Sequence, residues 1–138
     1  MRINYLAVVA AVLAGFVVSS IWYSPLLFGR QWMELRAVVP AATTESSMPV
    51  WKVLVELVRE LVVGYVIARF VLLGGVADWK GALGPGFWAW LGFPVAMLVG
   101  ASLWDNKPWL LSLIHGGDWL VKMLVMAVVV GAWHRKAS

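Results

Sequence analysis

The chain has 138 residues, of which 62% are hydrophobic and 13% are charged, and its formal net charge is +4. A soluble domain carries about 25% charged residues, so this composition indicates a membrane protein. The absence of cysteine excludes disulfides and thiolate metal sites. The basic residues are spread along the chain, so no nucleic-acid partner is expected. The length suits a single membrane domain over residues 1–138.

The first apolar stretch covers residues 3–23 and predicts a retained transmembrane helix. It follows Arg2 and is rich in alanine, as a secretory signal would be. However, it leads into Trp22-Tyr23 instead of a small-residue cleavage site. Small residues at every fourth position predict a face that another helix approaches closely. These residues are Ala7, Ala11, Gly15 and Ser19.

The segment after this helix predicts a short amphipathic helix in the plane of the membrane interface. Pro25 ends or kinks the first helix. From there to about Val38, apolar and aromatic side chains are mixed with Arg30, Glu34 and Arg36. Such a mixture suits a helix that lies at the surface of the bilayer.

Two stretches resemble a known family. The first is Trp22-Tyr23-Ser24-Pro25-Leu26-Leu27-Phe28-Gly29, followed by Trp32-Met33. It looks like the signature of a bacterial family of small four-helix membrane proteins, catalogued only as a domain of unknown function. The second, Ile114-His115-Gly116-Gly117-x-Trp119-Leu120-Val121, resembles the last helix of that family. The resemblance implies four spans and brings no catalytic residues, because the family has no established activity.

The second expected span, residues 50–74, is unusually charged in its first half. Four charged residues fall on one arc of roughly 100°, at spacings that permit ion pairs within the helix. They are Lys52, Glu56, Arg59 and Glu60.

A glycine-rich connection, residues 74–86, leads to the third expected span, residues 87–104. Pro94 should kink this helix. Its small residues repeat the ladder of the first helix and predict a second packing face. They are Gly92, Ala96 and Gly100.

The fourth expected span, residues 109–133, has a tryptophan at each end and three ionisable residues within it. His115, Asp118 and Lys122 fall within roughly 60° of one another on a helix. Polar groups on one face of a spanning helix must meet protein or water. The architecture predicted is therefore an all-α bundle of four transmembrane helices.

Four spans put both termini on one side of the membrane. Tryptophans then gather at the two interfaces as an aromatic belt, with Trp22 and Trp104 on one side and Trp133 on the other. Basic residues near the spans favour cytoplasmic termini in a bacterial inner membrane.

The second and fourth helices enter from the same side, so their polar residues are predicted to form one intramembrane layer. The layer comprises Glu56, Arg59, Glu60, His115, Asp118 and Lys122. A charge at the centre of a spanning helix costs about 2.5–3.5 kcal/mol on insertion scales, so mutual pairing is expected. We predict that Arg59 contacts Asp118 or Glu60, and that Lys122 contacts one of the same acids.

Several functions remain open for this layer. It can fix the helix register, hold the polar headgroup of a lipid-like or amphipathic molecule, or conduct protons or ions through Glu56, Glu60 and Asp118. His115 with Asp118 or Glu56 could form a base and its orienter, but no nucleophile motif lies near them. His115 and two carboxylates that have cationic partners do not suffice for a metal site. A haem held by His115 and His134 is not expected, because one helix would separate them by roughly 28 Å.

The preferred interpretation is a non-catalytic membrane protein without a cofactor. It self-associates or joins a membrane assembly, with membrane lipid, other subunits and an amphipathic small molecule as expected partners. The alternative is a proton- or ion-coupled small transporter. A small multidrug exporter fits poorly, because its first helix holds an essential acid and residues 3–23 hold none.

Overall fold

The computed structural model describes residues 3–36, 50–76 and 78–137, and within these ranges every regular element is a helix. α1 spans Tyr5–Trp22 and α2 spans Gly29–Arg36. α3 spans Val50–Leu73. α4, Trp79–Trp90, continues through the π-helical turn η1, Leu91–Val95, into α5, Ala96–Trp104. α6 spans Trp109–Ala137.

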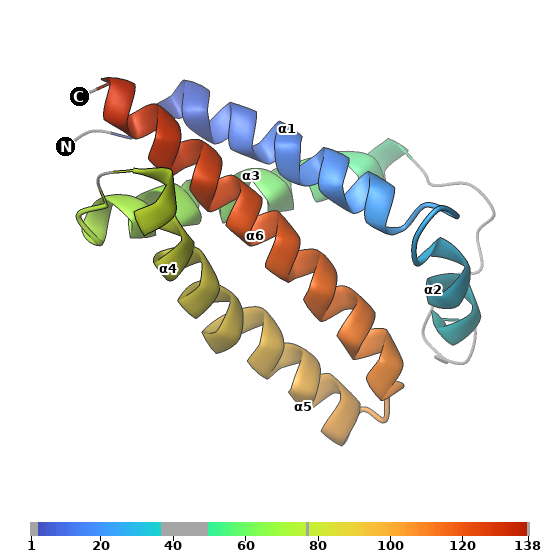
Figure 1. Ribbon diagram of the computed structural model, residues 1–138. Coiled ribbons are helices and arrows are strands. Elements are labelled where there is room, and N and C mark those ends of the chain that lie inside the picture. Colours follow the sequence, from blue (N-terminus) through green and yellow to red (C-terminus); the bar gives the residue numbers. More distant parts are fainter. Residues whose placement is uncertain (1–2, 37–49, 77, 138) are drawn as a thin grey trace.

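α6 is the central helix of the bundle (Figure 1). It packs against α1 on one side and against α4 on the other, and it also contacts α3. The start of α1 and the end of α6 lie at the same end of the molecule (Figure 1). α3 contacts α4 near their connection, whereas α5 diverges from α3 (Figure 1).

The small-residue ladder of α1 is a packing face, as predicted. Ala7 and Ala11 are completely buried. A Cβ on the buried Gly15 would lie 2.6 Å from Met126 Cε of α6. On α3, a Cβ on Gly64 would lie 2.7 Å from Val12 of α1. Helices with small residues at the contact can bring their backbones close together.

The ladder of the third helix does not pack against the rest of the described chain, unlike the ladder of α1. Gly92 and Ala96 are exposed, and a Cβ on Gly92 or Gly100 would meet no atom within 4 Å. The cause is the π-helical turn around Pro94. Such a turn inserts an extra residue and rotates the helix beyond it. Ser102 is therefore buried in place of the ladder.

The third helix begins at Trp79, eight residues before the expected start at residue 87. The glycines and Pro85 had suggested a connection. Asp78 caps the helix, because its Oδ1 accepts the backbone N–H of Gly81 at 2.8 Å. Pro85 lies inside this helix, where a missing N–H normally disfavours helical structure.

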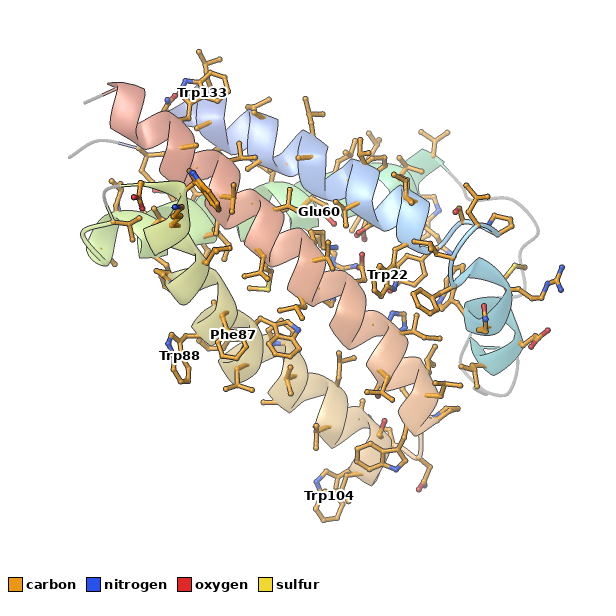
Figure 2. The ribbon with its side chains drawn as sticks, viewed as in Figure 1. Trp22, Glu60, Phe87, Trp88, Trp104 and Trp133 are labelled. Carbon is orange, nitrogen blue, oxygen red and sulfur yellow. The ribbon has the colours of Figure 1, made fainter. Side chains whose placement is uncertain are left out.

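The remaining helices match their expected bounds closely. α1 and α3 each end within one residue of the expectation, and α6 continues beyond residue 133. α2 lies within the segment expected to be amphipathic, of which residues 37 and 38 lie outside the described ranges. Figure 2 shows Trp133 at the end of α6 next to the start of α1, and Trp104 at the opposite end of the bundle.

Candidate functional site

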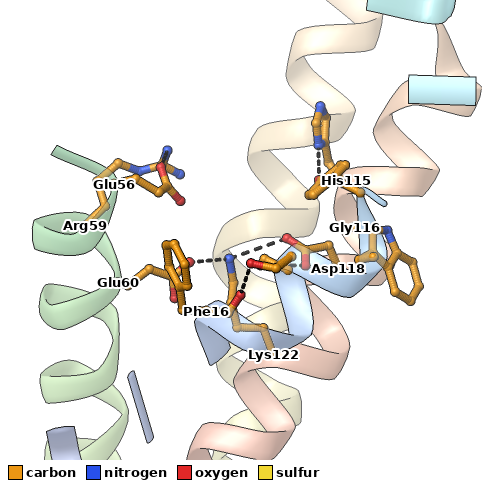
Figure 3. Close-up of polar contacts among 12 residues, drawn as sticks. Phe16, Glu56, Arg59, Glu60, His115, Gly116, Asp118 and Lys122 are labelled. Carbon is orange, nitrogen blue, oxygen red and sulfur yellow. Dashed lines mark hydrogen bonds and ion pairs between the residues drawn. The ribbon is translucent and has the colours of Figure 1, made fainter. Parts of the chain in front are cut away.

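Three helices contribute to a buried polar network between α1, α3 and α6 (Figure 3). Lys122 Nζ lies 2.7 Å from Glu60 Oε1 of α3 and 3.4 Å from Asp118 Oδ2 of its own helix. Ser19 Oγ of α1 donates to Asp118 Oδ1 at 2.8 Å. Glu60, Lys122 and Asp118 are only 1%, 2% and 3% exposed. We call Glu60, Asp118 and Lys122 the buried triad.

Local sequence explains why the buried triad can assemble. Asp118 and Lys122 are four residues apart on α6, a spacing that brings side chains together. Gly15 leaves space on α1: a Cβ there would lie 3.0 Å from Lys122 Cγ and 3.3 Å from Glu60 Oε2. The small residue on α1 therefore lets an acid of α3 meet a cation of α6 beside it.

The aromatic ring of Trp119 lies beside the buried triad. Lys122 Nζ is 3.7 Å from its ring centroid, a geometry that favours a cation–π interaction. Arg59 approaches the same ring, with its guanidinium carbon 5.8 Å from the centroid. Trp119 thus lies close to one buried cation and one exposed cation.

Arg59 and Glu56 form a separate pair on the surface of α3, which we call the outer pair. Arg59 Nη1 lies 2.7 Å from Glu56 Oε2, and the two side chains are 56% and 35% exposed. The predicted contact of Lys122 with an acid is confirmed. The predicted contact of Arg59 with Asp118 or Glu60 was wrong, because Arg59 pairs within its own helix and Ser19 and Lys122 occupy Asp118.

His115 belongs to a second cluster, formed where the end of α1 meets α6. Its Nδ1 lies 2.5 Å from the Tyr23 hydroxyl, and the ring of Tyr23 also packs against Trp32 of α2. Trp22 donates from Nε1 to the backbone carbonyl of Ile114 at 2.9 Å. A Cβ on Gly117 would lie 2.6 Å from Trp22 Cζ2, so the ring lies directly on this glycine.

This cluster brings together the two stretches that resemble the family of unknown function. The turn at the end of α1 also needs its final glycine, because a Cβ on Gly29 would lie 2.4 Å from the carbonyl oxygen of Tyr23. The aromatic residues of one stretch thus contact the histidine and glycines of the other. These contacts between the two stretches give a structural reason for both motifs.

Sequence reasoning missed several polar contacts on α6. Ser19 was expected only as a packing residue, and Trp22 only as an interface residue. Trp90 donates from Nε1 to the carbonyl of Gly116 at 2.8 Å, and the hydroxyls of Ser102 and Ser112 lie 2.5 Å apart. A buried indole N–H needs an acceptor, but the sequence alone does not show which carbonyl accepts it.

The site offers acid–base and cation-binding groups but no metal-ligand cluster. Among the described residues, no group of three or more His, Asp or Glu side chains is placed to hold a metal ion. What the geometry supplies is a buried ammonium between two carboxyl groups, with an exposed ion pair and an aromatic cluster nearby.

The fold and site define an all-helical protein with a charged network between apolar helices. In the described ranges, three helices are long and apolar enough to cross a membrane: Tyr5–Trp22, Trp79–Trp104 and Trp109–Trp133. The chain belongs to the family described as "Protein of unknown function (DUF1761)", whose model matches residues 6–131. The expected family resemblance is thereby confirmed. No curated protein and no solved structure matches the chain.

Proposed function

We propose that this chain is a non-catalytic integral protein of the bacterial inner membrane that self-associates through α3, which is its fourth spanning helix. α3 has 24 residues, or about 36 Å at 1.5 Å per residue, which exceeds a hydrocarbon core of about 30 Å. It contacts α1 and α6, both long and apolar enough to cross the membrane. In this arrangement α2 lies in the interface plane.

The observation that carries this proposal is the position of the outer pair. Arg59 is nine residues beyond the start of α3, so it lies about 14 Å along the helix. Its side chain and that of Glu56 are 56% and 35% exposed. Lipid at this depth rejects charged side chains, which in known membrane proteins face protein or water. A partner that covers α3 removes this cost.

A second copy of the chain fits this face best. The face opposite the buried side of α3 carries an exposed valine stripe at helical spacing, formed by Val55, Val58, Val62 and Val66. The outer pair beside it holds one cation and one anion, so the surface is complementary to itself. Self-complementary surfaces suit a two-fold symmetric dimer. The exposed ladder on α5, by contrast, is apolar and lipid can cover it.

Native mass spectrometry from mild detergent tests the proposal. The parent protein should have the mass of a dimer, and Glu56→Gln with Arg59→Gln should shift it to the monomer. Arg30→Gln with Glu34→Gln is the matched control, because both residues are exposed on α2. A monomeric parent would overturn the dimer, and an amphipathic small molecule retained by that monomer would support ligand binding instead. A monomer that retains no small molecule would contradict both self-association and ligand binding.

Proton-coupled transport is a second candidate, and one specific observation favours it. The buried triad contains two carboxylates and one ammonium, and its members are at most 3% exposed. Intramembrane acids of this kind mark proton relays in transporters. In this candidate function the triad exchanges a proton during the transport cycle.

A further inference from the structure

The charges of the buried triad do not balance. With every group ionised, Glu60 and Asp118 contribute two negative charges and Lys122 contributes one positive charge. The three residues are at most 3% exposed, so water does not screen the excess. An uncompensated charge in a low-dielectric interior costs several kcal/mol, and such a group commonly neutralises instead.

The two carboxyl groups differ in how well their oxygens are paired. Both oxygens of Asp118 have partners, because Oδ1 accepts from Ser19 and Oδ2 lies 3.4 Å from Lys122 Nζ. Glu60 Oε1 accepts from Lys122 at 2.7 Å. Glu60 Oε2 is buried without a hydrogen-bond partner among the described residues. An unpartnered carboxylate oxygen is far more costly to bury than an unpartnered neutral group.

The neighbouring charged groups do not remove the imbalance. From α3, Arg59 and Glu56 pair with each other at 2.7 Å and together are neutral. From α6, His115 contacts Tyr23 at the end of α1. Within Tyr5–Trp22, α1 contains no charged residue, and its nearest polar group is the Ser19 hydroxyl. Trp119 contributes only the face of its ring to Lys122.

We propose that Glu60 is a proton-binding site, with the bound proton on Oε2, so that the buried triad is neutral as a whole. The proton comes from a hydronium ion of the bulk water: one of its O–H bonds breaks as the O–H bond of the carboxylic acid forms, and a water molecule is left. Oε1 keeps its hydrogen bond from Lys122, and Asp118 remains the ionised partner of that ammonium. This inference deepens the second candidate function by naming the proton-binding atom, but its test requires no transport.

Infrared spectroscopy of the purified protein in lipid vesicles tests this assignment directly. At neutral pH the parent should show one carbonyl band of a protonated carboxylic acid. The band should shift when the protein is made with isotopically labelled glutamate and stay in place with labelled aspartate. It should disappear in Glu60→Gln, which mimics the protonated side chain, and persist in the surface control Glu34→Gln.

The labelling comparison uses only the parent protein, so it identifies the protonated residue even where Glu60→Gln fails to fold. A spectrum without an acid band at neutral pH would overturn the proposal. A band that follows labelled aspartate would also overturn it, because the proton would then sit on Asp118. The band reports whether a proton is bound to Glu60, and not whether protons cross the membrane. A positive result therefore stands even if vesicles show no proton transport.

Discussion

Lys122 connects two acids from different helices with one side chain that is 2% exposed. Its Nζ contacts Glu60 at 2.7 Å and Asp118 at 3.4 Å. The sequence predicted that Lys122 meets an acid, since the polar faces of α3 and α6 match in depth. Helical spacing permitted an ion pair between Arg59 and Glu56, but the sequence did not show that Arg59 would choose Glu56 over Asp118 or Glu60, because packing decides between partners within reach.

Removal of this cation should destabilise the bundle strongly. Lys122→Met leaves two carboxyl groups without their buried partner, and loss of one member of a buried pair costs about 3–5 kcal/mol. Adding Asp118→Asn should recover part of that loss, because the two residues are in contact. The free energy of unfolding in mild detergent measures both effects.

Lys107→Met is the control for this experiment, because Lys107 is exposed in the turn before α6. It should leave the free energy of unfolding within about 0.5 kcal/mol of the parent. Equal losses for Lys122→Met and Lys107→Met would show that the buried triad does not hold the helices together.

At the scale of the helix, two ladders with the same sequence pattern have opposite roles. Gly15 faces α6, where its Cβ would lie 2.6 Å from Met126 Cε, whereas Ala96 is exposed on α5. Sequence reasoning treated the ladders alike, because residue size and spacing were its only information. The π-helical turn that rotates the second ladder depends on how the backbone adjusts around Pro94.

Leucine substitutions separate the two ladders. Gly15→Leu should disrupt the fold, because a branched side chain must displace Met126 and Lys122. Ala96→Leu should leave the helical content and melting temperature of the chain near the parent values. Circular dichroism and thermal melts in detergent check this pair, and disruption by Ala96→Leu alone would contradict the assigned orientation of α5.

The whole molecule is the scale at which the sequence was most informative about architecture. Apolar stretches bounded by tryptophan predicted the long helices, since segments of this length suit a bilayer. Their order predicted neighbouring ends, and α1 begins beside the end of α6 (Figure 1). The start of α4 was missed, because glycines and Pro85 mask a helix that Asp78 begins.

The proposed four spans predict that both ends of the chain lie in one compartment. Reporter tags fused at Met1 and at Ser138 should both report the cytoplasm, because basic residues near the ends favour that side. The number is even only if α3 crosses the membrane, as proposed, together with the three helices that are long and apolar enough to do so. Tags in opposite compartments would show that α3 does not cross the membrane, and they would contradict the proposed interface.

Cysteine cross-linking in native membranes tests the central claim, that a second copy covers the outer face of α3. The chain contains no cysteine, so each single substitution reports on one position. Val62→Cys, at an exposed position of the valine stripe, should form a disulfide-linked dimer on oxidation, whereas Ala96→Cys on the exposed ladder of α5 should stay monomeric. Dimers through Ala96→Cys but not through Val62→Cys, or at neither position, would contradict the account.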